Sequence, residues 1–345
     1  MKQGKMMALG FYKPGAKTAA PNFEKVKIER PKATGKNLLV EVRAVSVNPT
    51  DLRTRDGKSE DDPSLTIVGR DAAGVVVETG EDCSLFQVRD EVFYAGTSNA
   101  PGSLSEFQLV DERIVGKKPK SIGFAEAAAL PLTSITASEA LFDRLGVSRN
   151  PADNGNKVIL IIGAAGGVGS VATQLAKLAG MTVVGTASRP KSKEWALDHK
   201  ADHIINHHEP FEPQLEALGI PGFHYIFCLT NVDDHMESMA KNILPQGKIC
   251  SILPALKPLH LALFSKSVTF SYELMYTRSV FQTEDMISQH HILKQVADWV
   301  DERKVRSTMT KRLSPLSPET LKEAYGNLLT GRTIGKIVIE GPIEH

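Results

Sequence analysis

A strand, a glycine-rich turn and a helix follow one another between residues 158 and 179, and this order constrains the fold more than any other feature. Val158–Ile162 is a continuous apolar run, which is typical of a strand buried on both faces of a parallel sheet. The turn Gly163–Gly169 comes next, and the helical pattern Val168–Ala179 ends at Gly180, a residue suited to a helix C-terminus. The sequence therefore predicts a strand–helix unit whose helix begins at a turn with almost no side chains.

This turn has the composition of a dinucleotide-binding site. Gly166, Gly167 and Val168 open the helix, where backbone N–H groups and the positive end of the helix dipole favour a pyrophosphate. Gly169 allows the helix to pack closely on the strand. The strict Gly-x-Gly-x-x-Gly pattern is not met, because Ala164 stands at its first glycine position. A tight turn that binds nothing is the alternative, but the complete strand–turn–helix–strand context favours a dinucleotide.

The end of the next strand distinguishes between the two nicotinamide dinucleotides. NAD sites place an Asp or Glu there, on the adenosine ribose, whereas residues 181–193 contain no acid. They contain the polar and basic residues Ser188, Arg189, Lys191 and Lys193. Arg189 can bind a 2′-phosphate through charge-assisted bonds worth roughly 1.5–3 kcal/mol each. We therefore expect NADPH as the cofactor, with Ser188, Arg189 and Lys193 as ligands; a solvated, basic helix start is the alternative.

The remaining pattern divides the chain into two kinds of structure. Short segments with alternating apolar residues before residue 119, such as Lys25–Glu29, predict a β-rich domain of antiparallel strands. From Lys157, strands and helices alternate, which predicts a parallel sheet with right-handed crossovers. An amphipathic helix at Met286–Val300, a helix at Pro318–Leu329 and a strand at Gly335–Glu340 end the chain. We expect this tail to fold back onto the first domain.

Composition narrows the class of protein. A length of 345 residues predicts two domains, and 41 Lys and Arg against 40 Asp and Glu argue against nucleic acid or an anionic membrane as a partner. Cys83, Cys228 and Cys250 are too few and too widely spaced for a disulfide framework, so we expect reduced thiols. The sequence contains no signal-peptide pattern and no apolar run of transmembrane length. We expect a cytoplasmic protein.

Short motifs along nearly the whole chain resemble the medium-chain dehydrogenase/reductase superfamily, and within it the zinc-free, quinone-oxidoreductase-like branch. These motifs are Val47–Leu52, Gly69–Gly74, Ala127–Thr133, Ala164–Gly169, Ser188–Pro190, Pro245–Gly247 and Gly335–Val338. The resemblance implies an α/β fold with a GroES-like β-rich catalytic domain (residues 1–130 and 275–345). It also implies a Rossmann doubly wound parallel-sheet domain that binds NADPH (residues 131–274), an active site in the cleft between the domains, and a homodimer.

Zinc-dependent relatives hold a catalytic metal with residues that this chain lacks. Where such relatives have a Cys and a Gly-His-Glu, the chain has Asn48 and Gly69-Arg70-Asp71. Zinc requires thiolate, imidazole or carboxylate ligands, and the permanent cation of Arg70 opposes it. The four closely spaced cysteines of a structural zinc lobe are missing, and the adjacent histidines at 207–208 and 290–291 are poorly placed for chelation. We expect no metal.

Without zinc, nothing in the sequence is suited to polarise an alcohol for oxidation. Reduction of a quinone or an α,β-unsaturated carbonyl needs mainly orientation, because the nicotinamide supplies the hydride. We therefore expect an NADPH-dependent quinone or enone reductase acting on a small molecule. A zinc-dependent alcohol dehydrogenase is one alternative. An NADPH-binding protein with a structural or regulatory role is another, because no single catalytic acid or base stands out.

Three residues are candidates for the catalytic site. The resemblance places Asn48 at the nicotinamide, where its amide can bond to a ribose hydroxyl or to the substrate; a role in an Asn-Pro turn is equally compatible. Asp51 is a weaker candidate, because it is suited to start the helix that follows Pro49. Tyr94 can donate a phenolic proton or stack on a flat substrate, although a tyrosine at the edge of the core is the commoner role.

Four further residues are candidates for cofactor binding. By resemblance, Thr133 lies close to the nicotinamide. Thr230 and Asn231 follow a strand, at the carboxyl end of the sheet where such folds bind ligands. Lys336 matches the family's C-terminal Gly-Lys and can reach the cofactor, although a surface lysine is the simpler interpretation.

Overall fold

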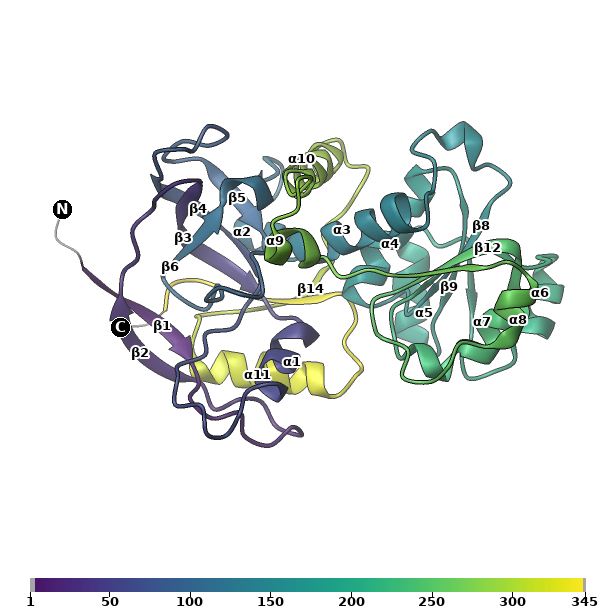
Figure 1. The fold of residues 1–345 in the computed structure, drawn as a ribbon, viewed down its shortest axis with the longest axis horizontal. Coiled ribbons are helices and arrows are strands. Elements are labelled where there is room, and N and C mark those ends of the chain that lie inside the picture. The colour runs from purple at the N-terminus through teal and green to yellow at the C-terminus, as the bar shows by residue number, and fades with distance from the viewer. Residues whose placement is uncertain (1–3, 344–345) are drawn as a thin grey trace. The chain divides into compact units, whose positions relative to one another are not determined.

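The computed structural model describes residues 4–343, and the chain divides into two compact units. Unit 1 consists of Met1–Leu132, Tyr276–Arg303 and Ser307–His345, and unit 2 consists of Thr133–Met275 and Lys304–Arg306. The C-terminal tail therefore belongs to the same unit as the N-terminal third (Figure 1).

A seven-stranded sheet forms the centre of unit 1 within residues 4–343, in the order β14-β15-β3-β4-β5-β7, with β6 paired to β3. Neighbouring strands are antiparallel except β14 and β15, which are parallel. The strands are β3 (Asn37–Ser46), β4 (Asp71–Thr79), β5 (Glu91–Tyr94), β6 (Phe107–Asp111), β7 (Val115–Lys117), β14 (Met309–Leu313) and β15 (Lys336–Glu340). A separate antiparallel ribbon contains β1 (Lys5–Gly10) and β2 (Glu24–Glu29).

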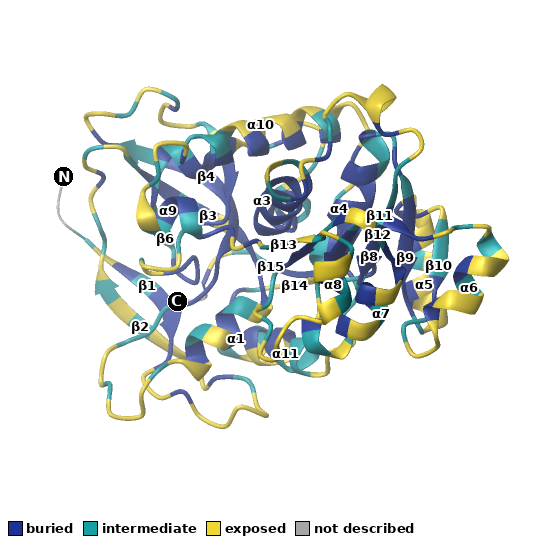
Figure 2. Ribbon diagram, turned by 45° about the vertical axis from the view of Figure 1, so that its right-hand side comes forward, coloured by how far each residue is buried: buried dark blue, intermediate teal, exposed yellow. Residues whose placement is uncertain are grey.

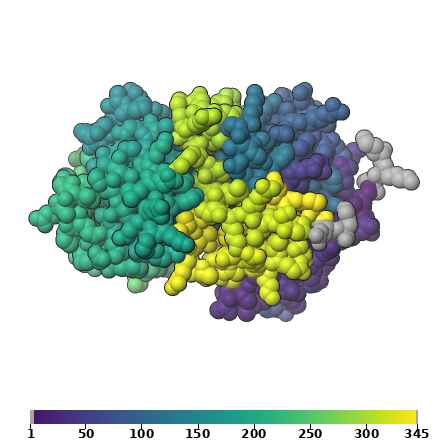
Figure 3. Space-filling view, turned by 180° about the vertical axis from the view of Figure 1, so that it is seen from behind, coloured from purple at the N-terminus to yellow at the C-terminus, as the bar shows by residue number. Residues whose placement is uncertain are grey.

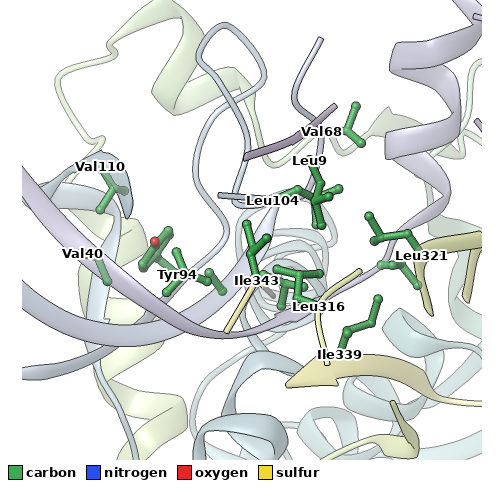
Figure 4. Packing of buried hydrophobic residues seen from close by; sticks show 14 of the residues in the cluster. Leu9, Val40, Val68, Tyr94, Leu104, Val110, Leu316, Leu321, Ile339 and Ile343 are labelled. Atoms are coloured by element: carbon green, nitrogen blue, oxygen red, sulfur yellow. The ribbon is translucent and has the colours of Figure 1, made fainter. Parts of the chain in front are cut away.

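The helices of unit 1 cover this sheet and enclose an apolar core. They are α1 (Pro49–Asp56), the 3-10 turn η1 (Glu112–Ile114), α2 (Phe124–Ala128), α9 (Thr277–Phe281), α10 (Ser288–Asp301) and α11 (Pro318–Leu329). Figure 4 shows side chains from both ends of the chain meeting in the core: Leu9 and Leu104 face Leu316, Leu321 and Ile339. These two distant stretches of sequence therefore share one core.

The last strand completes the sheet made by the first third of the chain. β15 pairs with β3 in the antiparallel register Val338 to Ser46 and Ile339 to Val45. In Figure 3 the C-terminal segment of unit 1 (yellow) lies against the N-terminal part of the same unit (purple). Residues 336–340 are thus an internal strand, flanked by β14 and β3.

Unit 2 contains a parallel sheet with the strand order β10-β9-β8-β11-β12-β13. Its strands are β8 (Val158–Ile162), β9 (Thr182–Thr186), β10 (His203–Ile205), β11 (Phe223–Cys228), β12 (Ile243–Ser251) and β13 (Thr269–Tyr272). Numbered within the unit, this order is 3-2-1-4-5-6, the order of a Rossmann fold. The expected α/β class, with a β-rich domain and a doubly wound parallel sheet, is confirmed.

Helices surround the sheet of unit 2 (Figure 1). They are α3 (Pro131–Ser138), the π-helical turn η2 (Glu139–Arg144), the 3-10 turns η3 (Pro151–Asp153) and η4 (Val232–Asp234), α4 (Gly167–Leu178), α5 (Pro190–Asp198), α6 (Phe211–Leu218), α7 (Met236–Asn242) and α8 (Leu261–Ser265). Figure 2 shows β8, β9 and β11 buried, whereas the outer side of α6 is exposed. The continuous apolar run at Val158–Ile162 is explained by this burial on both faces.

Some elements differ from the sequence expectations. The pattern at Phe124–Leu145 predicts a helical segment interrupted at Pro131, and the structure has this break between α2 and α3; the π-helical turn that follows was not expected. The strands β1 and β14 were not expected, because their alternation is interrupted by charged or small residues. No helix within the described part of the chain is long and apolar enough to span a membrane.

Candidate functional site

The strand order of unit 2 reverses direction between β8 and β11, and ligands of such folds bind outside the carboxyl ends of the strands at this point. Gly163 is the first residue after β8, and Thr230 is the second residue after β11. A Cβ atom built on Gly163 would lie 3.3 Å from Cγ2 of Thr230, so the two loops touch. Thr230 and Asn231 are exposed, and the Asn231 side chain caps the 3-10 turn by accepting from the Asp233 N–H. The fold therefore places Thr230 beside the glycine turn, and Asn231 follows it in the chain.

The glycines of the turn differ in whether the backbone conformation or the packing requires a glycine. Gly163 has φ +91°, which favours glycine. A Cβ atom on Gly169 would lie 2.3 Å from the carbonyl oxygen of Gly163, so only glycine allows α4 to approach β8 this closely. Gly166 has neither reason: its φ is −75°, and a Cβ atom there would lie 3.4 Å from the nearest protein atom, Gly163 O. The space above Gly166 is kept by neither packing nor backbone conformation, and it lies at the N-terminus of α4, where a phosphate fits.

The end of β9 presents the polar residues expected to bind the adenosine end of a cofactor. The Gly163 N–H donates to Oγ1 of Thr186 at 3.0 Å, which ties the glycine turn to β9. Ser188 is half-buried, and Arg189 and Lys193 are exposed at the start of α5. Arg189 is the N-cap residue of this helix, and its backbone N–H donates to the Ser192 hydroxyl at 3.2 Å. The Arg189 side chain thus begins beside the carboxyl end of β9.

In unit 1, a buried ammonium group joins three distant segments. Lys336, at the start of β15, is 4% exposed, so the expectation of a surface lysine is wrong. Its Nζ donates to the Val47 carbonyl at 2.9 Å, to Oδ2 of Asp71 at 3.1 Å and to Oδ1 of Asn48. An ammonium group has three hydrogens, and these three acceptors use all of them.

The amide of Asn48 is held by the same network. Nδ2 donates to Oδ2 of Asp71 at 2.8 Å and to the Ser46 carbonyl at 3.2 Å, so both amide hydrogens are used. Oδ1 accepts from Lys336 and retains one further lone pair. In this arrangement, Asn48 can accept another hydrogen bond but cannot donate one.

Asp51 caps the start of α1, the role that its place after Pro49 suggested. Its Oδ2 accepts from the Asn48 N–H at 2.8 Å and from the Tyr325 hydroxyl at 3.0 Å, and its Oδ1 accepts from the Gly69 N–H at 3.2 Å. Burial raises the pKa of this carboxyl above its ordinary value of 3.8, although the Asn48 N–H and the charge of Arg70 act in the opposite direction. The carboxyl holds the start of α1 in place.

Arg70 lies near this network without joining it. Its Nη1 donates to the Thr97 carbonyl at 2.6 Å and to the Ala100 carbonyl at 3.3 Å. The guanidinium carbon is 5.9 Å from the centre of the Tyr276 ring. Two basic and two acidic side chains thus lie in the interior of unit 1, all of them at most 4% exposed: Arg70, Lys336, Asp51 and Asp71.

Two other candidates are buried. Tyr94 is fully buried in the apolar core, close to Val40 and Val110 in Figure 4, and its hydroxyl has no hydrogen-bond partner within residues 4–343. Burial raises the pKa of this phenol above its ordinary value of 10. Thr133 is 2% exposed in α3. Their roles in catalysis and cofactor binding stay predictions.

A second cluster of buried titratable side chains, in unit 2, was missed in the sequence. Glu273 follows β13 and Glu139 begins the π-helical turn; both are at most 2% exposed. Arg144 Nε donates to Oε2 of Glu273 at 2.9 Å. Burial, followed by the hydrogen bond and charge of Glu139, raises the pKa of Glu273 to about 9. Glu273 therefore keeps its proton at neutral pH.

The residues of unit 1 do not fit a zinc ion. Zinc needs several thiolate, imidazole or carboxylate donors around one point, and no such group of three or more His, Cys, Asp or Glu occurs among the described residues. The carboxylate of Asp71 is instead bonded to the Lys336 ammonium and the Asn48 amide. A cation held within the protein already occupies the position next to this carboxylate.

Comparison with known proteins identifies the family. The family model described as "Alcohol dehydrogenase GroES-like domain" matches residues 34–131, and the one described as "Zinc-binding dehydrogenase" matches residues 199–339. A "Zinc-type alcohol dehydrogenase-like protein" of Staphylococcus epidermidis is 39% identical over 335 residues, which cover 97% of this chain and 99% of that protein. The chain belongs to the medium-chain dehydrogenase/reductase superfamily.

Other members of this superfamily are also similar. The crystal structure of "a putative zinc-dependent alcohol dehydrogenase protein from Rhizobium etli CFN 42" superposes on this chain with a TM-score of 0.92 at 43% identity, covering 99% of each chain. The 2-methylene-furan-3-one reductase of Solanum lycopersicum is 29% identical over 319 residues, which cover 88% of this chain and 71% of that protein. The chain is thus an oxidoreductase of the medium-chain dehydrogenase/reductase type.

Removal of the internal ammonium group will destabilise unit 1. We expect Lys336→Met to lower its free energy of unfolding by about 3–5 kcal/mol, because Asp71 would stay buried without its cation. Each unit contains one tryptophan, Trp299 in unit 1 and Trp195 in unit 2, so urea unfolding in a Trp195→Phe background reports on unit 1. The double variant Lys336→Met/Asp71→Asn should regain part of the loss. Equal stability of the single variant and the parent would contradict the interpretation.

The stability of unit 2 will depend on pH through Glu273. Its pKa is raised in the folded state, so its contribution is complete below about pH 4.5 and is lost as pH rises towards about 9. In a Trp299→Phe background, Trp195 fluorescence should report a loss of more than about 1 kcal/mol between these limits. Glu273→Gln keeps a neutral hydrogen-bonding group and should flatten the profile. The prediction fails if parent and variant share the same slope.

Proposed function

We propose that the protein is an NADPH-dependent, zinc-free reductase of quinones or α,β-unsaturated carbonyls. The observation that carries the proposal is the open glycine turn at the strand-order reversal, followed by a strand end with basic residues and no acid. When bound, NADPH supplies the hydride. A relative that reduces 2-methylene-furan-3-one, as its name says, supports the same substrate class.

The cofactor's pyrophosphate is proposed to lie against the N–H groups of Gly166, Gly167 and Val168. The room above Gly166 supports this position, because a side chain there would meet the ligand and not the protein. Ser188, Arg189 and Lys193 are proposed to bind the adenosine 2′-phosphate, which favours NADPH because these groups are cationic or donate hydrogen bonds. Thr230 and Asn231 are proposed to contact the cofactor beside Gly163.

In unit 1, Asn48 is proposed to accept a hydrogen bond from a hydroxyl of the cofactor's ribose. Both of its amide hydrogens are used by the protein, so donation to a substrate oxygen would require the network to open. Lys336 is proposed to act through Asn48, because its three hydrogens are already used within the protein. Asp51 would position the same segment, and direct proton donation by Tyr94 would require its buried ring to move.

The described residues contain no group of side chains suited to bind zinc, and this supports reduction over alcohol oxidation, since alcohol oxidation needs a group that polarises the alcohol. The homodimer that the resemblance implies is supported by exposed apolar side chains near the edge strand β13, which include Leu261, Phe264 and Leu274. The alternative of an NADPH-binding protein without turnover stays open to experiment.

The activity is tested by following NADPH absorbance with quinones, enones, aldehydes and alcohols. We expect oxidation of NADPH with quinones or enones, and no loss of that activity after treatment with a chelator. Alcohol oxidation that requires stoichiometric zinc would favour an alcohol dehydrogenase. Tight NADPH binding without turnover of any compound would favour a binding protein.

The choice of cofactor is tested at Arg189. We expect Arg189→Ala to weaken NADPH binding by at least tenfold and to leave NADH binding nearly unchanged, because only NADPH carries the 2′-phosphate. Lys191→Ala removes a neighbouring exposed cation and is the matched control. Equal losses of affinity for the two dinucleotides, measured by isothermal titration calorimetry, would contradict the assignment.

A further inference from the structure

A cluster of histidines, His207, His208 and His235, lies beside the proposed phosphate site of unit 2. The Ala187 N–H donates to the Ile205 carbonyl at 3.1 Å, so the ends of β9 and β10 are adjacent. Two residues beyond these positions stand Arg189 and His207. Arg189 and His207 therefore leave the same edge of the sheet next to each other.

His207 is surrounded mainly by groups that are, or can become, positively charged. Its ring centre is 4.3 Å from that of His208 and 6.2 Å from that of His235. Burial, and then the charges of His208, His235 and Arg189, lower the pKa of His207 below its ordinary value of 6.5. The nearby acids interact with other residues: Glu209 accepts a hydrogen bond from Asn206 Nδ2 at 2.7 Å, and the charge of Asp234 acts to raise the pKa of His235.

His207 also has an unused polar atom. Its Nδ1 is buried and has no hydrogen-bond partner among residues 4–343. A buried, unpaired polar atom costs free energy that a hydrogen bond would recover. A bound anion could accept a hydrogen bond from protonated His207.

We propose that His207 is a further ligand of the cofactor's adenosine 2′-phosphate and binds it in the protonated form beside Arg189, so that NADPH binding takes up a proton that NADH binding does not. This inference rests on the proposed NADPH function and adds a dependence on pH to it. The phosphate dianion supplies the negative charge that offsets repulsion among Arg189, His207 and His235. The proton comes from solvent.

The test measures the dissociation constants of NADPH and NADH between about pH 6 and pH 8. We expect the ratio of NADH to NADPH dissociation constants to rise as pH falls, by up to about tenfold per pH unit where one proton is taken up. In His207→Asn the ratio should stay constant apart from the phosphate's own titration near pH 6. The matched control is His208→Asn, which removes the adjacent exposed histidine and should retain the dependence.

A second measurement on the unchanged protein protects the test against a misfolded variant. Adenosine 2′,5′-bisphosphate should raise the pKa of His207, followed by nuclear magnetic resonance, whereas adenosine 5′-monophosphate should leave it unchanged. A pH-independent preference for NADPH, or the same slope in His207→Asn, would overturn this inference alone. Absence of NADPH binding at every pH would overturn the proposed function and this inference together.

Discussion

The buried ammonium group of Lys336 is the interaction on which the interior of unit 1 depends. It bonds to the carbonyl of Val47 directly after β3, to Asn48 and to the first residue of β4, and it comes from the last strand in the chain. An isolated buried charge is costly, so the position is stable only with the carboxylate of Asp71 and the two carbonyl-type oxygens in place. The same bonds orient Asn48, which makes the architecture of the domain and the geometry of the candidate site inseparable.

In unit 2, the parallel sheet brings helix N-termini to one of its edges, and the contacts that hold them there are different from those of unit 1. Gly169 allows α4 to touch the turn after β8, and Thr186 ties that turn to the neighbouring strand. Neither of these contacts needs a glycine at position 166, where a Cβ atom would fit against the protein. The loops at the carboxyl edge of the sheet differ in their charged and titratable residues. Arg189 follows β9 and His207 follows β10, and no acid follows β9 directly. The sheet positions these loops, and the loops differ in the basic residues that they contain.

Much of the fold was predictable because its signals are local. The apolar run at Val158–Ile162 and the glycines after it identify a buried strand and a close helix without knowledge of any other residue. The helix at Pro318–Leu329 was predicted with its observed bounds, since Ser317 and Pro318 form a clear helix start. The network around Lys336 was not predictable, because Asp71 lies 265 residues away and only the folded sheet brings the two together. The Glu139–Glu273 pair was missed for the same reason.

The discontinuous composition of unit 1 has a consequence for synthesis of the chain. Unit 2 is almost continuous in sequence, so nearly all of it is available once residue 275 has left the ribosome. Unit 1 then still lacks α11 and β15, and with them Tyr325 and Lys336, the partners of Asp51 and Asp71. Domains fold as units during synthesis, and here the first one to begin is the last to finish. Until the C-terminal residues are synthesised, Asp51 lacks the Tyr325 hydroxyl, Asp71 lacks the Lys336 ammonium group, and residues 44–46 of β3 have no strand on that side. An unpaired strand edge of this kind can pair with another chain.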